Sequence, residues 1–232
     1  MSVGARVLKY QIHRAYARPA PVTIKIYSDP GASLDTVDGY AERTGDLQTW
    51  DQIHDGAGTG RDFLGINSWA LIIASMTEPR WRQIIRHKCT FDLVNVPVGS
   101  DIQIVTYNVW VLTSNNTLGG SPTIALFTSP VPPYNNVLTT DYPGFGSTPI
   151  SDVVNLALIP TNVWQKWTVT DANLGLFVPG QKVAIGIREA AYDAADGAPP
   201  WVAGASIFIS FATVDHPTVS IRPYLEVTYQ PP

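Results

Sequence analysis

Residues 81–113 read WRQIIRHKCTFDLVNVPVGSDIQIVTYNVWVLT, and this stretch decides the fold. Between Trp81 and Leu93 apolar side chains recur at alternate positions, with polar and charged side chains between them. A period of two indicates a β-strand with one buried face. The residues that follow are those that turns prefer: Pro97, Gly99, Ser100 and Asp101. A second strand then begins, so the stretch predicts a β-hairpin.

The second strand of this pair is apolar on both of its faces. One face carries Ile102, Ile104, Trp110 and Leu112, and the other carries Val105, Tyr107, Val109 and Val111. Such a strand lies at the centre of a packed sheet or beneath a partner. Two explanations stay open: a second layer of the same domain covers the valine-rich face, or a partner molecule does.

The rest of the chain consists of short strand-like runs separated by turn-forming residues. Further strands are predicted at 22–27, 39–43, 50–53, 68–76, 122–130, 163–170, 182–190, 206–214 and 224–230. Residues 129–152 form a long Pro/Gly/Asn-rich loop, and loops of this length are usually functional or ordered by a neighbour. About ten short strands without a long helix predict an all-β, antiparallel sandwich or barrel.

The composition limits the classes of function. The net charge of −4 gives no basic surface for direct contact with nucleic acid. No apolar run approaches the length of a membrane span, and Cys89 is the single cysteine, so no intrachain disulfide can form. No signal peptide is recognisable, so we expect either folding in a reducing compartment or a targeting segment that was removed before this numbering begins.

Side chains suited to catalysis are sparse. The four histidines, at positions 13, 54, 87 and 216, have no metal-ligand spacing. His87 is expected to be a core residue with satisfied hydrogen bonds. Glu189 and Asp92 are the acids within strong strands, and we expect each to pair with an arginine such as Arg188 or Arg86. The sequence therefore favours a protein that is not an enzyme.

Two segments share the pattern D-x-x-D-G and offer a weak calcium site. Their acids are Asp35, Asp38, Asp193 and Asp196. Carboxylates beside the carbonyl groups of a turn suit Ca²⁺, which takes six to eight oxygen ligands. Asp-Gly is also an ordinary turn pair, and no other cofactor is expected.

Aromatic side chains are the candidates for ligand binding. Trp69, Trp81, Trp110 and Trp167 lie within predicted strands and are expected in the core. The aromatic residues on predicted loops could stack on sugar rings or anchor an interface. These are Trp201, Tyr192, Tyr134, Tyr142 and Phe145.

Several segments together resemble a known group of jelly-roll β-sandwich domains. They are DGYAERTGDLQTWDQIHDGAGT, RWRQIIRHKCTFDLVNVPVGSDI, AIGIREAAYDAADGAPPW and the terminal PYLEVTY. The shared patterns are R-x-x-x-x-F-D, then P-x-G-[AS]-x-I, and a closing P-x-L-x-V-x-Y. The resemblance covers about residues 34–230. It implies a jelly-roll-like β-sandwich over residues 34–232, preceded by an N-terminal arm and strand at 1–33.

Domains of this group occur in tailed-phage virion proteins and in bacterial surface or carbohydrate-binding modules. The resemblance therefore implies a virion structural protein, such as a capsid decoration, head-fibre or tail component. Its partners would be copies of itself and other virion proteins. It would fold in the host cytoplasm and be displayed on the extracellular particle surface. The alternative is a carbohydrate-binding or host-attachment module that contacts cell-surface glycans through the loop aromatics.

Overall fold

Two long strands that follow one another in sequence, β5 (Trp81–Asp92) and β6 (Asp101–Asn116), organise the sheet. They do not form the predicted hairpin, because β5 pairs with β2, β4 and β10, whereas β6 pairs with β9, β11 and β12. The Tyr107 ring of β6 lies 5.6 Å from the Phe91 ring of β5, centroid to centroid. The two strands thus face each other across the core instead of lying side by side.

The computed structural model describes residues 18–29 and 35–232. Its other strands are β1 (Val22–Ile26), β2 (Asp38–Gln48), β3 (Gly60–Asp62), β4 (Asn67–Ala74), β7 (Thr123–Thr128), β8 (Val154–Asn155), β9 (Val163–Thr168), β10 (Lys182–Glu189), β11 (Ser206–Ala212) and β12 (Tyr224–Gln230). The helices are α1 (Trp50–Asp55) and four short 3₁₀ turns, η1 (Thr139–Gly144), η2 (Leu156–Leu158), η3 (Asp171–Leu176) and η4 (Val219–Ile221). Within the described part of the chain, no helix is long and apolar enough to cross a membrane.

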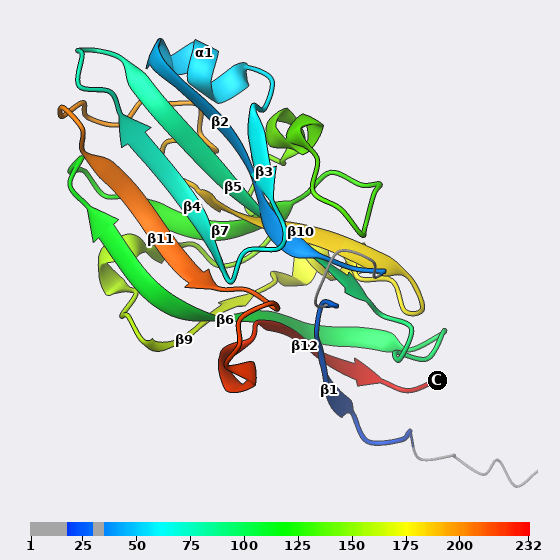
Figure 1. The fold of residues 1–232 in the computed structure, drawn as a ribbon. Coiled ribbons are helices and arrows are strands. Elements are labelled where there is room, and N and C mark those ends of the chain that lie inside the picture. Colours follow the sequence, from blue (N-terminus) through cyan, green and yellow to red (C-terminus); the bar gives the residue numbers. More distant parts are fainter. Residues whose placement is uncertain (1–17, 30–34) are drawn as a thin grey trace, which may run out of the picture.

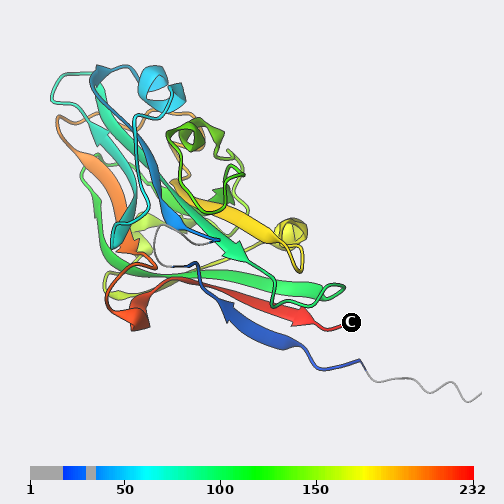
Figure 2. The ribbon, with the colours of Figure 1, turned by 45° about the vertical axis from the view of Figure 1, so that its right-hand side comes forward.

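All strand pairs are antiparallel, and the strands form one curled sheet with the path β1-β12-β6-β11-β4-β5-β10-β7-β8 (Figure 1). The curl brings different parts of the sheet face to face, so the fold is the antiparallel β-sandwich that the sequence predicted. β1, β12 and β6 lie side by side at one end of the molecule (Figure 2). The predicted N-terminal arm lies mostly outside the described residues.

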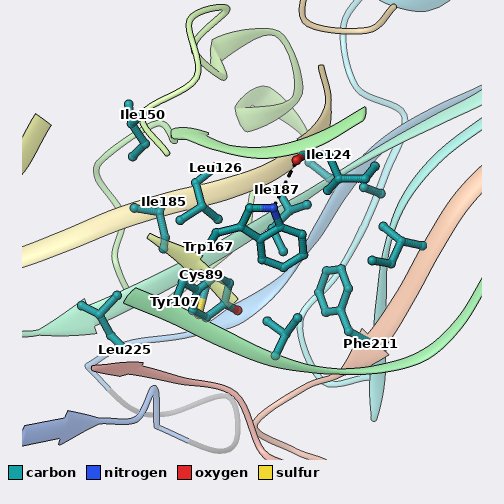
Figure 3. Close-up of a cluster of buried hydrophobic side chains, with 14 of the residues drawn as sticks. Cys89, Tyr107, Ile124, Leu126, Ile150, Trp167, Ile185, Ile187, Phe211 and Leu225 are labelled. Atoms are coloured by element: carbon teal, nitrogen blue, oxygen red, sulfur yellow. Dashed lines mark hydrogen bonds between the residues drawn. The ribbon is translucent and has the colours of Figure 1, made fainter. Parts of the chain in front are cut away.

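The packing of the core shows what covers the face of β6 that carries Val105, Tyr107, Val109 and Val111. Trp167 of β9 is fully buried at the centre of the cluster, and its indole nitrogen donates to the Ile124 carbonyl oxygen at 3.1 Å (Figure 3). Tyr107 is also fully buried there, with Val105, Val109 and Val111. A second layer of the same domain therefore covers this face, and no partner is needed.

His87 lies in this core, as the sequence predicted. Its ring nitrogens lie 2.9 Å from Ser68 Oγ and 3.1 Å from Tyr107 Oη. Burial lowers the pKa of His87 to about 3, so the ring is neutral near pH 7 and both of its nitrogens have partners.

The strand predicted at residues 50–53 is instead the helix α1. Thr49 Oγ1 accepts from the backbone N–H of Gln52, and the Gln52 side chain accepts in return from the backbone N–H of Thr49. This capping box satisfies two donors that a helix start leaves free. Trp50 then packs edge-on against Trp81, with ring centroids 5.1 Å apart, and this contact fixes the helix on the start of β5.

The polar side chains predicted on the open face of β5 are buried from Arg86 to Thr90, while Arg82 near the start of the strand is exposed. Arg86, Lys88 and Thr90 are each at most 2% exposed. The long 129–152 loop covers this face: Lys88 Nζ donates to Asp141 Oδ2 at 2.8 Å, and Thr90 Oγ1 donates to the Tyr134 carbonyl oxygen at 2.6 Å. The prediction of one solvated face was therefore wrong, because this loop replaces the water.

Asp193, in the turn after β10, is the counter-charge of two buried arginines. Its carboxylate accepts from Arg86 Nη2 at 2.6 Å and from Arg188 Nε at 2.8 Å. Burial alone would raise the pKa of Asp193, but the two guanidinium groups outweigh it and hold this pKa well below its ordinary value. The arginines also donate to carbonyl oxygens of the long loop, those of Tyr142 and Gly146. The Asp193 carboxylate, through its two arginines, thus fixes the turn after β10 and the 129–152 loop to the sheet.

Asp38 is buried without a counter-charge of this kind. Its Oδ2 accepts from the backbone N–H of Val214 at 2.8 Å, while its Oδ1 has no hydrogen-bond partner. Burial raises the pKa of Asp38 to about 7, so its carboxyl is largely protonated in the folded protein at mildly acidic pH.

Replacing Asp193 with alanine leaves Arg86 and Arg188 buried without their counter-charge. Breaking a buried ion pair in this way costs about 3–5 kcal/mol, and we expect the free energy of unfolding in urea to fall by that amount. The control is Asp35→Ala, which removes an exposed carboxylate 3.4 Å from Lys182 and should cost less than about 1 kcal/mol. Equal losses in the two variants would contradict this role for Asp193.

The raised pKa of Asp38 predicts that this carboxyl stabilises the fold less as the pH rises from about 4 to about 7, whereas His87, with its lowered pKa, acts in the opposite direction. In this window the unfolded chain, with an ordinary aspartate pKa of about 3.9, has lost the proton that the folded chain keeps. The variant Asp38→Asn keeps the acceptor for Val214 and cannot ionise. We expect its melting temperature to exceed that of the wild type at pH 8, and the difference between the two melting temperatures to grow from pH 4 to pH 7, because His87 contributes equally to both proteins. A wild-type slope retained in Asp38→Asn, as it should be in the exposed control Asp35→Asn, would refute the assignment.

Candidate functional site

The loop aromatics predicted to bind a ligand do not form one surface. Tyr142 is fully buried and its hydroxyl donates to the Ile53 carbonyl oxygen at 2.7 Å. Phe145 is also buried, and a Cβ on Gly186 would lie 2.4 Å from its ring. Glycine on β10 thus makes room for the Phe145 ring. Because both rings are buried, Tyr142 and Phe145 secure the 129–152 loop and have no open face for stacking.

The other three loop aromatics are half-buried. The Trp201 indole nitrogen donates to the Arg80 carbonyl oxygen at 2.9 Å, and the Tyr192 hydroxyl accepts from the backbone N–H of Ser121 at 3.3 Å. Both rings pack against the main core. Tyr134 lies beside Thr128, Val131 and Leu176 around a separate pocket. Each of the three keeps part of its ring exposed, and the structure does not gather them into one site.

A different set of aromatic residues lines a groove on the sheet itself. The groove crosses β2, β5, β4 and β11 and has a volume of about 360 Å³. Its lining residues are Tyr40, Glu42, Trp69, Leu71, Ile73, Gln83, Ile85, Ser206 and Phe208. We call this surface the sheet groove. Its size falls within the range of small-ligand sites.

The alternation of β4 explains why the sheet groove is apolar. Ala70, Ile72 and Ala74 are buried, whereas Trp69, Leu71 and Ile73 on the opposite face are only half-buried. Trp69 was predicted to lie in the core and instead stands on the open face. Its ring packs edge-on against Tyr40, with the two centroids 5.3 Å apart. The larger side chains of this strand are thus turned toward solvent.

Polar side chains border this apolar surface. The Gln83 side chain donates to Glu42 Oε2, which places an amide and a carboxylate next to each other across β5 and β2. Burial, together with the nearby carboxylates of Glu42 and Asp62, raises the pKa of Tyr40 to about 12. The Tyr40 hydroxyl therefore keeps its proton at neutral pH. The groove combines aromatic faces with hydrogen-bond donors and acceptors.

A second group of aromatic rings lies on the outer side of β6, β9 and β12. Trp110 and Trp164 pair across β6 and β9 with centroids 5.8 Å apart, and Tyr224 lies 5.2 Å from Trp164. Both contacts are edge-on, so each ring covers part of the next. Trp110, predicted to be in the core, is half-buried in this row, while Trp81 and Trp167 are buried as predicted.

The four acids predicted to hold calcium are dispersed. Asp35 is exposed beside Lys182, and Asp38 is buried beside Val214. Asp193 is bound to its two arginines, so its carboxylate has little capacity left for a cation. Asp196 is exposed, with its Oδ1 3.1 Å from Nδ1 of His54.

Neither of the two strand acids takes the partner that the sequence suggested. The carboxylate of Glu189 accepts backbone N–H groups of Thr123, Ala191, Tyr192 and Asp193, and it thereby shapes the turn in which Asp193 lies. Asp92 accepts the backbone N–H of Val94 at the end of β5. Glu189 therefore acts on Arg86 and Arg188 indirectly, by positioning Asp193.

Comparison with known proteins assigns no family to this chain. No family model matches the sequence, and no curated protein matches it. Among solved structures, one match is a chain described as "Structural basis for the promiscuous specificity of the carbohydrate-binding modules from the beta-sandwich super family". The match has 9% sequence identity and a TM-score of 0.22, and it covers 85% of this chain and 98% of that chain. A superposition this loose says nothing about ligands.

Proposed function

We propose that this protein is a non-enzymatic module that binds carbohydrate in the sheet groove. The observation that supports this proposal is the half-buried pair Trp69 and Tyr40 beside the polar pair Glu42 and Gln83. The apolar face of a sugar ring packs against aromatic rings, and its hydroxyl groups need donors and acceptors at the rim. The groove supplies both kinds of contact.

The location of the sheet groove on paired strands also favours it over the loop aromatics as the binding site. Its residues come from paired strands, and sites on regular elements hold their geometry better than sites on loops. Leu71, Ile73, Ile85 and Phe208 give the groove its apolar lining. Trp69 packs against Tyr40 but leaves part of its ring on the open face, and exposed apolar patches commonly mark binding sites.

The variant Trp69→Ala should lose carbohydrate binding while it keeps the fold. A probe is first chosen from a panel of soluble polysaccharides by affinity electrophoresis, and its dissociation constant is then measured by calorimetry. Burying one aromatic side chain contributes about 1.5–3 kcal/mol, so we expect affinity to fall at least about tenfold.

Two tryptophan variants outside the groove serve as matched controls. Trp164→Ala changes the outer aromatic row and Trp201→Ala changes the loop, and neither residue lines the sheet groove. Both variants should bind the probe as the wild type does. Loss of binding in Trp201→Ala with retention in Trp69→Ala would move the site to the loops, and a panel without any binding would overturn the proposal.

A second candidate is a structural protein of a virus particle, such as a capsid decoration, head-fibre or tail component exposed on the particle surface. Exposed apolar side chains around the β5–β6 turn and on β6 support this candidate, among them Val94, Val98 and Ile104. Among the described strands, the edge strand β1 pairs on one side only, with β12, and an open strand edge can pair with another chain. The two roles are compatible, because a particle component can carry a glycan-binding groove.

If the protein is a structural component of a virus particle, we expect it to form a homo-oligomer. The chain has a mass of 25.2 kDa, so light scattering on the purified protein should give a multiple of that mass. An exposed apolar contact would be weakened by Val98→Asp, which should shift the protein toward the monomer. A stable monomer at high protein concentration would count against a self-assembling particle component and would leave the carbohydrate proposal untouched.

A further inference from the structure

His54, Asp55 and Asp196 bring three ligating atoms together at the mouth of a small pocket. The His54 Nδ1 atom lies 2.6 Å from Asp55 Oδ1 and 3.1 Å from Asp196 Oδ1. In the part of the chain that the structure describes, no other group of three or more His, Cys, Asp or Glu side chains converges in this way. The pocket behind them has a volume of about 220 Å³.

The second nitrogen of the His54 ring, Nε2, is a hydrogen-bond donor. It lies 2.6 Å from the main-chain carbonyl oxygen of Asp193. A carbonyl oxygen only accepts hydrogen bonds, so Nε2 must carry a proton. Asp193 is itself held by Arg86 and Arg188. The ring orientation is therefore set by a partner outside the three ligating side chains.

This tautomer directs the Nδ1 lone pair toward two carboxylates. A lone pair and two acceptor oxygens repel one another unless a positive charge lies between them. A metal cation bound by all three atoms supplies this charge. In metal sites a histidine ligand characteristically donates its other N–H to a carbonyl or carboxylate, and His54 makes this contact.

We propose that His54, Asp55 and Asp196 form a binding site for a divalent metal ion of the zinc class. One imidazole nitrogen and two carboxylate oxygens suit Zn²⁺, with water as the fourth ligand. Ca²⁺ fits less well, because it takes six to eight oxygen ligands. The cation class thus differs from the one that the D-x-x-D-G pattern suggested, although Asp196 belongs to that pattern.

The distances are compatible with one shared ion. Two ligands bound to Zn²⁺ at about 2.0–2.1 Å lie roughly 3.3 Å apart in a tetrahedron. The His54–Asp196 pair nearly matches this value, and Asp55 has to withdraw by less than about 1 Å. Asp55 can do so because its side chain is 61% exposed.

His54 is the ligand that the fold holds in place, whereas the Asp196 side chain is 61% exposed, as is that of Asp55. The His54 side chain is 11% exposed and its ring stacks on Trp50, with centroids 5.4 Å apart. Asp196 has a backbone φ of 53°, the left-handed conformation that aspartate and asparagine tolerate. An ion bound here would connect α1 to the turn after β10. It would stabilise the folded state by mass action, since the unfolded chain lacks the site.

The test is a titration of EDTA-treated, dialysed protein with Zn²⁺, followed by calorimetry and by the melting temperature. We expect one saturable site and a melting temperature that rises with zinc concentration. Co²⁺ added in place of Zn²⁺ should give visible absorption bands, which report an ion bound by protein ligands. The same titration with Ca²⁺ should give a smaller rise.

The informative variant is Asp196→Asn, which keeps the left-handed backbone and removes one anionic ligand. It should weaken zinc binding at least about tenfold. Asp51→Asn, an exposed position on the same helix, and His216→Ala, on a surface turn, should both bind zinc as the wild type does. Absence of saturable one-site binding, or equal affinity in Asp196→Asn, would overturn the proposal.

Discussion

The contact between the Asp193 carboxylate and two buried arginines is the constraint on which the rest of this fold depends. Arg86 and Arg188 lie on neighbouring strands, and neither could be buried without a counter-charge, because removing an ion from water costs several kcal/mol. The arginines use their remaining donors on carbonyl oxygens of the 129–152 loop. A long loop without much regular structure thereby becomes a fixed second layer, and Lys88 with Asp141 adds an ion pair beneath it.

This layer decides which face of the sheet can bind a ligand. The loop side of β5 is closed by Tyr142 and Phe145, whose rings fill the space between loop and strands. On β4, by contrast, Trp69 and Leu71 have no covering loop among the described residues and line the sheet groove. The open face that remains is therefore on the strands, where the proposed carbohydrate site lies, while Tyr142 and Phe145 of the loop serve stability.

The sequence predicted the β-sandwich correctly because its strands carry period-two patterns that need no tertiary information. It failed where a distant segment determines the outcome. Arg86 and Lys88 look solvated on β5 until the 129–152 loop is placed over them. The β4 pattern misled for another reason: both of its faces are apolar, and the face with the larger residues, Trp69 among them, is the open one. The capping box of Thr49 and Gln52 was a readable signal for α1 that the strand prediction overlooked.

The orientation of β4 itself bears on function. A strand that buried Trp69, Leu71 and Ile73 would remove more apolar surface from water than one that buries Ala70, Ile72 and Ala74. In the observed register Ala70 and Ile72 lie beside Ile209 and Ile207 of β11 on the buried face, which places Trp69, Leu71 and Ile73 on the other face. Since natural sequences need not keep tryptophan on an open strand for stability, a ligand or a partner that contacts Trp69 is the explanation consistent with both the packing and the groove.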